Sequence, residues 1–465
     1  MTTATRDSPE KVWSPRLRDR GPVYRDLVRA LEADIRSGAL EPGDRLPTHR
    51  ELASTLGISR GTVAKAYDEA QRLGLAYSGV GQGTFVAHAY EVQARRGPDP
   101  DQIDFGMGYP IYELDPDLAG PLAAIAADPG RAELSRYPDP EGRREHRAAG
   151  ARWCAHLGVE TSADGVVVTG GGQHAIHTWL LSALAPGDTL LVGELTYRMA
   201  AVAAQEVGIE IRGVEMDAEG LLPDALAKAA SETLAGGLYL MPTIDNPTTG
   251  VLSDERRLQI AEVIRDHDLR VLEDDIHGPF HSEPRPIPLK VLCPERVTYV
   301  ASLSKSVVGG LRVAYAVPPE RERPSFFSAL VNSLWSPPPL TAEVAGRLID
   351  AGAAFEVVAA KEREATTRLE LLCRRLQPLV PSLRSAAYFA WMELPEPWTA
   401  TGFALAARRQ GVVVMSADAF YFGNGSAPPA VRIALGGVTR SQIERGADLL
   451  AGLLERPGGP LVPIV

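Results

Sequence analysis

The chain has 465 residues, of which 45% are hydrophobic and 23% are charged, and its formal net charge is -11 at pH 7. This length exceeds that of one domain, and the composition is that of a globular protein rather than of a disordered or fibrous one. The cysteines, Cys154, Cys293 and Cys373, are widely separated. That spacing argues against a disulfide framework and against a zinc site, and it favours a reducing compartment.

The acidity is unevenly distributed along the chain. Residues 1–88 hold 13 Lys and Arg against 11 Asp and Glu, so the negative charge belongs to the remainder. A near-neutral segment can bind DNA when its arginines cluster where phosphates lie, so the charge permits a nucleic-acid partner. The opening residues, MTTATRDSPEKVW, lack the apolar core of a signal peptide, and no apolar run approaches the roughly 18 residues of a membrane span. We therefore expect a cytoplasmic protein without a membrane partner.

The segment 22–87 predicts three helices followed by a hairpin. Apolar residues recur at helical spacing from Val23 to Ile35, which predicts the first helix. Thr48, with Glu51 three residues later, predicts a second helix that begins with a capping box and ends at Gly57. Two helices joined by a tight glycine turn form a helix-turn-helix.

The third helix is expected from Arg60 to about Leu73, with Ser59 as its cap. Its core side would be Val63, Ala66, Tyr67 and Ala70. Ser59, Arg60, Thr62 and Lys65 lie near its N-terminal end, where hydroxyls, cations and free amides can meet phosphates and base edges. The glycine-rich residues 79–83 between two apolar runs predict a hairpin, or wing. A helical bundle with solvated charges would fit each helix taken separately.

The motifs of this segment resemble the GntR-type winged helix-turn-helix domain. They include Pro42-Gly43-Asp44-Arg45-Leu46-Pro47, Leu56-Gly57-Ile58-Ser59-Arg60-Gly61-Thr62-Val63 and Gly81-Gln82-Gly83-Thr84-Phe85-Val86. The resemblance implies that Arg50 and Arg60, the start of the recognition helix, and the wing tip at Gln82 and Gly83 contact operator DNA. We therefore place a DNA-binding domain at residues 15–87.

Residues 88–102 are polar and read as a linker. From Ile103 onward, apolar strand-like runs alternate with Ala- and Leu-rich helical segments, which is typical of an α/β domain with a mainly parallel sheet. We place this domain at residues 103–455. Ligands in such sheets gather at the carboxyl ends of the strands.

One short stretch of the large domain combines the groups that an aldehyde cofactor needs. Lys305 lies among small hydroxyl residues, with Arg312 seven positions later. An amine can hold a pyridoxal cofactor as a Schiff base, and hydroxyls and a guanidinium can hold its phosphate. Lys305 would supply the amine, and Ser302, Ser304 and Arg312 the phosphate donors. Taken alone, the same stretch could be a solvated loop.

Several other predicted strands end in residues suited to the same cofactor. A strand at 166–169 leads to Gly170-Gly171-Gly172-Gln173, a turn whose amides can approach a phosphate. A strand at 269–272 runs into Glu273-Asp274-Asp275, and an acid that ends a buried strand can pair with a protonated pyridine nitrogen. Each motif has an ordinary structural reading, but their order makes coincidence an unattractive explanation.

That order resembles the fold-type I aminotransferases across about residues 103–455. The resemblance assigns Gly171, Gly172, Gln173, Ser302, Ser304 and Arg312 to the phosphate, Asp274 to the pyridine nitrogen, Asn246 to the ring hydroxyl, Tyr197 to the ring face and Lys305 to the Schiff base. It also assigns Arg432 to a substrate carboxylate, for which a planar guanidinium fork is suited. Tyr137 would reach the cofactor phosphate across a dimer interface, which implies at least a homodimer.

His277 departs from that pattern, because the family often has a tyrosine there that contacts the ring hydroxyl. Histidine can still donate a hydrogen bond, but its charge is pH-sensitive. We therefore expect the cofactor, pyridoxal 5'-phosphate, to bind, whereas efficient turnover is less expected. His277 could also be a structural histidine.

A GntR-type reader fused to an aminotransferase-like domain resembles the MocR/GabR family of transcription regulators. The resemblance implies operator DNA as one partner, an amino compound or pyridoxal phosphate itself as the sensed molecule, and a head-to-tail, domain-swapped homodimer. The alternatives are an active aminotransferase with an accessory DNA-binding domain, and a regulator whose large domain only dimerises.

Overall fold

The computed structural model describes residues 13–15, 23–36, 39–40, 44–72, 75–79, 83–86, 102–233, 235–281 and 284–455. These residues form two compact units, the second of which begins at Ile103. The predicted linker lies outside the described residues except for Gln102, and so does Gln82 at the predicted wing tip.

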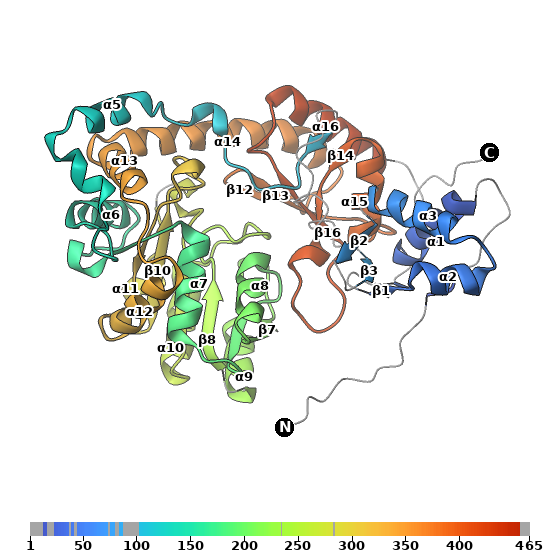
Figure 1. Cartoon of the computed structure of the whole chain (residues 1–465), viewed down its shortest axis with the longest axis horizontal. Coiled ribbons are helices and arrows are strands. Elements are labelled where there is room, and N and C mark those ends of the chain that lie inside the picture. Colours follow the sequence, from blue (N-terminus) through green and yellow to red (C-terminus); the bar gives the residue numbers. More distant parts are fainter. Residues whose placement is uncertain are drawn as a thin grey trace. The chain divides into compact units, whose positions relative to one another are not determined.

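The first unit is a winged helix-turn-helix. Its elements are α1 (Val23–Arg36), β1 (Arg45–Leu46), α2 (His49–Leu56), α3 (Arg60–Arg72), β2 (Ala76–Gly79) and β3 (Gly83–Val86), as Figure 1 shows. The strands form an antiparallel sheet in the order β1-β3-β2. The three predicted helices and the hairpin are therefore confirmed.

Local sequence signals explain where α2 and α3 begin and how they pack. The backbone N–H of Glu51 donates to the Thr48 hydroxyl, and the Thr48 N–H donates to the Glu51 carboxylate at 2.8 Å, which is the predicted capping box. Val63 and Tyr67 of α3 are buried as predicted, and the Tyr67 hydroxyl donates to the Pro47 carbonyl at 2.8 Å. This bond fixes the recognition helix against the chain that precedes α2.

The second unit contains a seven-stranded sheet in the order β5-β11-β10-β9-β8-β6-β7. Its strands are β5 (Val167–Thr169), β6 (Thr189–Gly193), β7 (Glu210–Val214), β8 (Ala235–Leu240), β9 (Arg270–Asp274), β10 (Val297–Ser302) and β11 (Ala314–Val317). Only β11 runs against its neighbours, so the prediction of a mainly parallel sheet is confirmed.

Helices cover both faces of this sheet (Figure 1). They are α6 (Arg144–His156), α7 (Gly172–Ala183), α8 (Arg198–Glu206), α9 (Pro223–Glu232), α10 (Asp254–Asp266), α11 (Leu289–Leu292), α12 (Arg323–Ser333) and α13 (Pro339–Asp350). Along β8, Tyr239 packs in the cluster that includes Trp179 of α7, whereas Leu238 packs in the cluster that includes Ile260 of α10. Strands buried on both faces need continuous apolar runs, which is the pattern that the sequence shows.

The C-terminal part of the second unit forms a smaller antiparallel sheet in the order β12-β13-β16-β15. Its strands are β12 (Arg384–Ala386), β13 (Phe389–Glu393), β15 (Met415–Ser416) and β16 (Ala430–Ala434), and the nearby helices are α14 (Ala353–Leu376), α15 (Ala400–Arg409) and α16 (Arg440–Leu454). The strand β4 (Ile103–Asp104) pairs in parallel with β14 (Val412–Val413). The start of the large unit is thereby attached to its C-terminal part.

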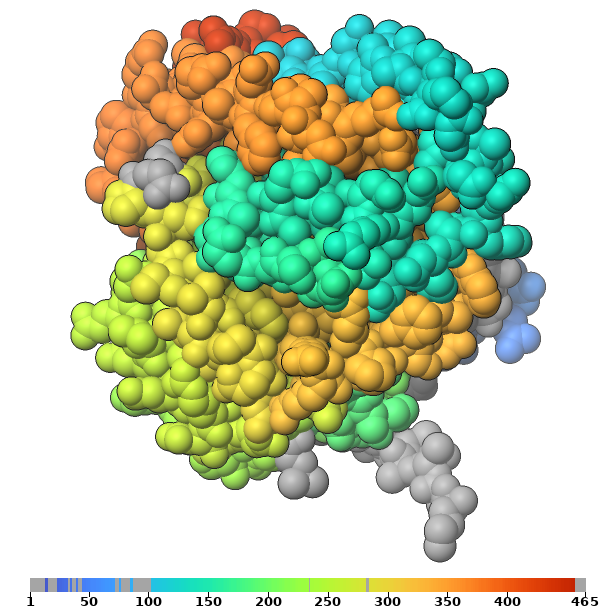
Figure 2. Space-filling model, turned by 90° about the vertical axis from the view of Figure 1, so that its left-hand side faces the viewer, coloured from blue at the N-terminus to red at the C-terminus, as the bar shows by residue number. Residues whose placement is uncertain are grey.

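The remaining elements are α5 (Ala119–Ala127) and short 3-10 helices. These are η1 (Tyr112–Leu114), η2 (Pro129–Ser135), η3 (Ala163–Gly165), η4 (Gly278–Phe280), η5 (Gly309–Leu311), η6 (Glu320–Glu322) and η7 (Ala417–Phe420). Figure 2 shows α5, η2 and α6, coloured cyan to teal, beside α13 in orange on one face of this unit. Within the described ranges, no helix has the length and apolar character needed to cross a membrane.

Candidate functional site

Five predicted ligand-binding residues lie at the carboxyl ends of strands in the large sheet. Asp274 ends β9, and Lys305 follows β10. Asn246 follows β8, Tyr197 follows β6, and Gly171 follows β5. Because these strands are parallel, their carboxyl ends meet at one edge of the sheet, where ligands of such folds bind. This edge is the candidate site.

Lys305 carries an amine suited to attack on a carbonyl carbon. Its Nζ donates to the Gly108 carbonyl at 2.5 Å. Loss of water around the charged amine, together with the nearby positive charges of Arg432 and Arg312, lowers the pKa of Lys305 to about 8. Roughly a tenth of the amine is therefore unprotonated at pH 7, far more than for an ordinary lysine, and this is the form that condenses with an aldehyde.

Two of the three consecutive acids at the end of β9 have arginine partners. Glu273 lies 3.8 Å from Arg257, and Asp275 lies 3.5 Å from Arg285. All four side chains are largely buried, so each arginine, rather than solvent, compensates the charge of its acid. Asp274, between the two acids, differs from both.

Asp274 is buried and accepts hydrogen bonds from neutral groups. The Tyr239 hydroxyl donates to its Oδ2 at 2.9 Å, and the Ile276 N–H donates to its Oδ1 at 3.3 Å. Within the described part of the chain, no Lys, Arg or His forms an ion pair with it. Burial raises the pKa of Asp274 to about 6, although both hydrogen bonds oppose that shift. A ligand with a cationic N–H would supply the missing charge.

The turn after β5, the serines after β10 and Arg312 form a cradle for an anion. Gly171 has φ 95°, and a Cβ placed there would lie 2.8 Å from Arg312 Nη2, so the guanidinium packs directly over this turn. Arg312 Nη1 donates to the Ser304 hydroxyl at 3.2 Å, and the Ser304 N–H donates to the Ser302 hydroxyl at 3.2 Å. Gly172 begins α7, whose free N-terminal amides add to the positive potential. This set of donors suits a phosphate.

The side chain of Gln173 is turned toward α8. The Tyr197 hydroxyl donates to Gln173 Oε1 at 3.2 Å, and Gln173 Nε2 donates to the Met199 carbonyl at 3.2 Å. Gln173 therefore offers its backbone N–H to the cradle, while its side chain orients Tyr197. The ring of Tyr197 is partly buried beside the same edge of the sheet.

Arg432 of β16 connects the small sheet to the site. Its Nη1 donates to Asn246 Oδ1 at 2.7 Å, and its Nη2 donates to the Gly106 carbonyl at 2.6 Å. The guanidinium carbon lies 5.1 Å from the ring centre of Phe389 and 4.8 Å from that of Phe420. These contacts hold a cation at an apolar position, where a carboxylate would bind strongly.

His277 is buried beside the two functional cations and is neutral. Burial, Lys305 and Arg432 together lower its pKa to about 3, and a hydrogen-bonding interaction with the Ile244 backbone acts in the opposite direction. Its ring lies 5.0 Å from that of Phe389 in an edge-to-face contact. Among the described residues, neither ring nitrogen makes a hydrogen bond of standard length and angle, although the Ile244 backbone lies close enough to affect the pKa of the ring. At least one of the two nitrogens is therefore available to a ligand.

Tyr137 is not part of this group within one chain. Its side chain is 89% exposed, and its ring lies 6.2 Å from that of Trp335. The predicted contact with a cofactor therefore requires a second copy of the chain and stays a prediction.

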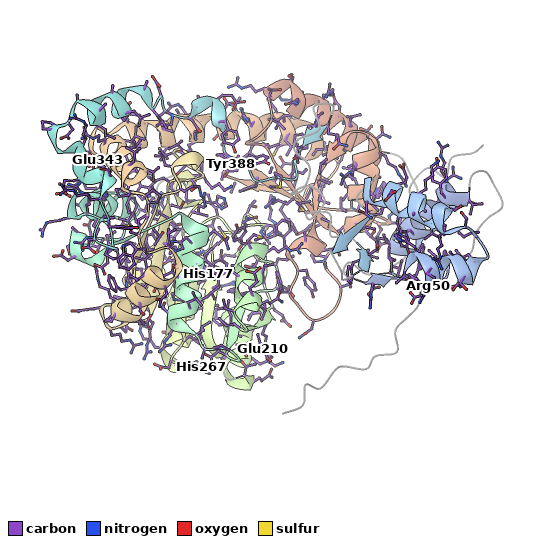
Figure 3. All side chains as sticks on the ribbon, in the orientation of Figure 1. Arg50, His177, Glu210, His267, Glu343 and Tyr388 are labelled. Carbon is purple, nitrogen blue, oxygen red and sulfur yellow. The ribbon has the colours of Figure 1, made fainter. Side chains whose placement is uncertain are left out.

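The predicted DNA-binding residues of the first unit lie on and beside α2 and α3. Arg50, labelled in Figure 3, and Arg60 are exposed. Ser59 caps α3, because its hydroxyl accepts from the Thr62 N–H at 3.0 Å, and it also shares a hydrogen bond with the Thr62 hydroxyl. Lys65 places its amine 4.2 Å from the ring centre of Tyr24. Gly83 begins β3, whereas the neighbouring Gln82 is not described.

Several residues of the site were not predicted from the sequence. Gly106 and Gly108 accept from Arg432 and Lys305 through their carbonyls. Tyr239, the donor to Asp274, lies inside a buried strand. For the two glycines, the run Gly106-Met107-Gly108 is a signal in the sequence, because glycines next to a strand indicate a turn. A tyrosine inside an apolar strand gives no comparable signal.

The chemistry of the large unit fits pyridoxal 5'-phosphate. The Lys305 amine can condense with its aldehyde, and the Asp274 carboxylate can pair with its protonated ring nitrogen. The cradle around Gly171 and Arg312 can bind its phosphate. His277 has a ring nitrogen available for a hydrogen bond to a ring substituent. The fit depends on side-chain chemistry at four separate points of one molecule.

Comparisons with known proteins agree with both units. Residues 23–86 match the family described as bacterial regulatory proteins, gntR family, and residues 101–450 match aminotransferase class I and II. The chain is 31% identical over 451 residues to the uncharacterized HTH-type transcriptional regulator YdeF of Bacillus subtilis, covering 95% of this chain and 97% of that one. It is 25% identical to the probable rhizopine catabolism regulatory protein MocR of Rhizobium meliloti, covering 67% and 68%.

Among solved structures, the large unit is similar to LysN, an alpha-aminoadipate aminotransferase of Thermus thermophilus complexed with N-(5'-phosphopyridoxyl)-L-leucine. The TM-score is 0.67 at 26% identity, and the match covers 77% of this chain and 92% of that one. The cofactor of the large domain is accordingly pyridoxal 5'-phosphate. The chain belongs to the MocR-type transcription regulators, in which a GntR helix-turn-helix domain and a class I and II aminotransferase domain share one polypeptide.

Proposed function

We propose that this regulator binds operator DNA through residues 15–87, and that residues 103–455 bind pyridoxal phosphate and sense an amino compound, with residues 88–102 as the linker. The observation that carries the proposal is the arrangement of Lys305 and Arg432. Both cations donate to carbonyls of one short turn, at Gly108 and Gly106. A ligand that binds either cation therefore competes with the chain itself.

The cofactor supplies an aldehyde and an electron-withdrawing ring. Lys305 holds the aldehyde carbon through its amine, and Asp274 holds the ring N–H. The cradle of Gly171, Gly172, Ser302, Ser304 and Arg312, with the backbone of Gln173, binds the phosphate. Tyr197 would pack against the ring, and Asn246 and His277 would hold the ring oxygen. Each role follows from the hydrogen-bonding capacity of the group concerned.

The effector is an amino compound that carries a carboxylate. Its amine reaches the position of the Lys305 amine, and its carboxylate pairs with Arg432. A planar guanidinium can donate to both carboxylate oxygens in place of Asn246 Oδ1 and the Gly106 carbonyl. Phe389 and Phe420 keep the guanidinium in place during this exchange.

The turn at residues 104–108 is the segment whose conformation changes when a ligand binds. Asp104 Oδ1 accepts from the Gly106 N–H at 2.8 Å and from the Met107 N–H at 3.2 Å, which closes the turn. The adjoining strand β4 has only two residues. When a ligand displaces both carbonyls, the turn loses its bonds to the two cations, and in the sequence this turn directly follows the proposed linker. Operator affinity then depends on ligand by linkage, because the ligand prefers one state of the turn.

A homodimer, with head-to-tail exchange of DNA-binding domains, completes the assembly. Tyr137 is almost fully exposed. Large apolar side chains are also exposed on α5 and α13, at Leu122 and Leu340, and directly after α12, at Leu334 and Trp335. The helices α5 and α13 lie on the face seen in Figure 2. We propose that this face pairs with a second copy, and that Tyr137 of each copy reaches the other's phosphate cradle.

An active aminotransferase is the second candidate. The observation that favours it is the lowered pKa of Lys305, because turnover needs a free amine that can move a proton. The regulator remains the stronger reading, because the similarity to a transcriptional regulator extends over 95% of this chain and includes the DNA-binding unit.

The test combines cofactor mapping with operator binding. The purified full-length protein is supplied with pyridoxal phosphate, reduced with borohydride and mapped by peptide mass spectrometry. We expect the label on Lys305. Lys290 is the matched comparison, because burial lowers its pKa to about 8 as well, yet its amine donates to the Pro294 and Val297 carbonyls away from the cradle. Label on Lys290, or none, would remove the assigned cofactor site.

The second measurement follows function. DNA fragments bound by the protein are selected from genomic DNA, and their affinity is measured with and without a panel of amino acids and diamines, while keto-acid formation is assayed in parallel. A regulator changes its operator affinity without rapid turnover. Fast product formation with no change in operator affinity would support the aminotransferase instead.

A further inference from the structure

The turn before α7 contains three consecutive glycines, Gly170, Gly171 and Gly172. Glycine loses more conformational freedom on folding than any other residue, so ordering a run of three is costly. Gly171 has φ 95°, a region of backbone conformation that other residues rarely adopt. A phosphate that binds to the backbone of such a turn binds more tightly when other contacts have already selected one conformation.

Two side chains, one before the turn and one after it, make such contacts. The Thr169 hydroxyl, at the end of β5, shares its hydrogen between the Ala314 carbonyl at 3.2 Å and the Gly171 carbonyl at 3.4 Å. From α7, His174 Nδ1 accepts from the Gly170 N–H at 3.0 Å. The first peptide groups of the turn are therefore held on both sides.

The hydrogen bonds of the His174 ring fix its tautomer. Nδ1 accepts from the Gly170 N–H, so the proton of the neutral ring lies on Nε2. Nε2 therefore donates to the Ser333 hydroxyl at 2.9 Å, and that hydroxyl donates in turn to the Leu330 carbonyl at 3.1 Å. The Thr178 hydroxyl lies 3.3 Å from the same Nε2. The ring is thus oriented through both of its nitrogens.

His174 is neutral near pH 7. Burial, followed by the nearby charge of His177, lowers its pKa to about 4. A protonated ring carries a hydrogen on each nitrogen and cannot accept from Gly170. The acceptor for the Gly170 N–H is therefore present under the conditions in which cofactor binding is measured.

We propose that His174 is a positioning residue for the phosphate cradle: by holding the Gly170 N–H, it keeps the backbone amides of residues 171–173 in one arrangement before a phosphate binds. It acts through the backbone of the turn and not by contact with the phosphate. This inference rests on the proposed function, because the phosphate is that of the proposed pyridoxal phosphate site.

A second reading is that His174 only caps α7. It is the third residue of this helix, and a side chain there can stabilise a helix by accepting from a backbone N–H just before it. A helix cap affects the free energy of unfolding without regard to the ligand. Positioning of the turn affects only ligands that carry a phosphate. Pyridoxal separates the two readings, because it has the aldehyde and the ring of the cofactor but no phosphate.

The experiment compares full-length wild type with His174→Leu, His174→Asn and His177→Leu. Leucine and asparagine have the same branched shape, but only asparagine has an oxygen near the position of Nδ1, so only His174→Asn keeps an acceptor for Gly170. His177, labelled in Figure 3, lies three residues further along α7, and His177→Leu is the matched control. If His174→Leu does not fold, His174→Ala replaces it, because alanine also lacks the acceptor and suits a helix.

Three quantities are measured for each variant. They are the dissociation constants of pyridoxal phosphate and of pyridoxal, followed by visible absorption, and the rise in melting temperature caused by inorganic phosphate. His174→Leu should weaken pyridoxal phosphate binding about fivefold, as expected for one lost hydrogen bond, and should reduce the response to inorganic phosphate. Its affinity for pyridoxal should not change. His174→Asn and His177→Leu should resemble wild type in all three measurements.

The possible failures can be told apart. If His174→Leu weakens pyridoxal phosphate and pyridoxal equally, or weakens neither, the inference is wrong. It is also wrong if His174→Asn binds pyridoxal phosphate as weakly as His174→Leu, because the acceptor would then not be the group that matters. If wild type gains no visible absorption with either aldehyde, the proposed cofactor site at Lys305 fails. The response to inorganic phosphate then still decides the role of His174, because it does not involve Lys305.

Discussion

Replacing Asp274 with Asn should have opposite effects on the cofactor-free and the cofactor-bound protein. In the cofactor-free protein the carboxylate is buried, and its hydrogen bonds come from the neutral donors Tyr239 and Ile276. Burial raises its pKa from the ordinary value of 3.8 to about 6. The ionised Asp274 carboxylate therefore destabilises the cofactor-free protein, and the cationic ring N–H of the cofactor would compensate its charge.

The sign of the pH dependence follows from this raised pKa. The folded protein keeps the proton on Asp274 up to about pH 6, whereas the unfolded chain loses it near pH 3.8. The free energy of unfolding therefore falls as pH rises through this window, and the loss is complete above it. A shift of about two pKa units corresponds to about 3 kcal/mol. Asp274→Asn should recover up to this amount at pH 7.5 and almost none at pH 3.5.

The effect on the cofactor has the opposite sign. The bound ring nitrogen carries a proton that pairs with the Asp274 carboxylate, and an amide cannot replace that charge. Hydrogen bonds to charged groups contribute about 1.5–3 kcal/mol, so pyridoxal phosphate should bind roughly 10- to 100-fold more weakly. One substitution would then stabilise the protein alone and weaken its complex.

Urea unfolding of cofactor-free protein, followed by tryptophan fluorescence at fixed protein concentration, measures the first effect, and absorption titration measures the second. Asp245→Asn is the matched control. Asp245 is also buried with a pKa raised to about 6, but its Oδ2 accepts from the N–H and hydroxyl of Thr248 in a local turn. It should show the pH-dependent gain without the loss of cofactor affinity. If Asp274→Asn left cofactor affinity unchanged, the charge argument for the site would be refuted.

Three further predictions concern other parts of the chain. Arg60→Ala should weaken operator binding by about 1–3 kcal/mol, measured by fluorescence anisotropy, and unchanged affinity with the fold intact would reject its role. Gly171→Ala should reduce cofactor affinity, because a Cβ would lie 2.8 Å from Arg312 Nη2, whereas Gly187→Ala, with a similar φ of 93° and no atom within 4 Å of its Cβ, should not. An equal loss in both variants would mean that backbone strain is responsible. Tyr137→Phe should weaken cofactor binding about fivefold while sedimentation still shows a dimer, and an unchanged affinity would contradict the contact across the interface.

The fold was predictable where the determining signals are local. The capping box of Thr48 and Glu51 lies within four residues, and the helix that it predicts is present. The parallel strands β6, β9 and β10 have five or six residues each and contain short apolar runs, such as Leu190-Leu191-Val192 and Val271-Leu272, which carry their own signal. The order of the site motifs along the chain also identified the domain type, because each motif follows a strand.

The long-range contacts of the site were not predictable in the same way. Lys305 and the Gly108 carbonyl are 197 residues apart in the sequence, and Arg432 and the Gly106 carbonyl are 326 apart. No local pattern reports such a pair. The small sheet is similar in one respect, because β13 pairs with β16, which follows only after α15, β14 and β15, and both strands are almost entirely apolar, so that neither shows an alternation of apolar and polar residues.

The shared turn makes one more consequence testable, namely that cofactor and effector help each other to bind. A carboxylate at Arg432 displaces the Gly106 carbonyl, and a turn that has lost one of its two anchors releases the Gly108 carbonyl from Lys305 more easily. A simple carboxylate without an amine, such as propionate, should therefore raise the affinity for pyridoxal phosphate, whereas propionamide should not.

By thermodynamic reciprocity, pyridoxal phosphate should raise the affinity for propionate by the same factor, for which couplings of about 5-fold or more are typical. Absorption titration measures the first factor and calorimetry the second. Arg432→Lys should abolish the coupling, because an ammonium cannot replace the two-pronged contact. Equal effects of propionate and propionamide, or factors that differ between the two titrations, would show that the two ligands do not act through this turn.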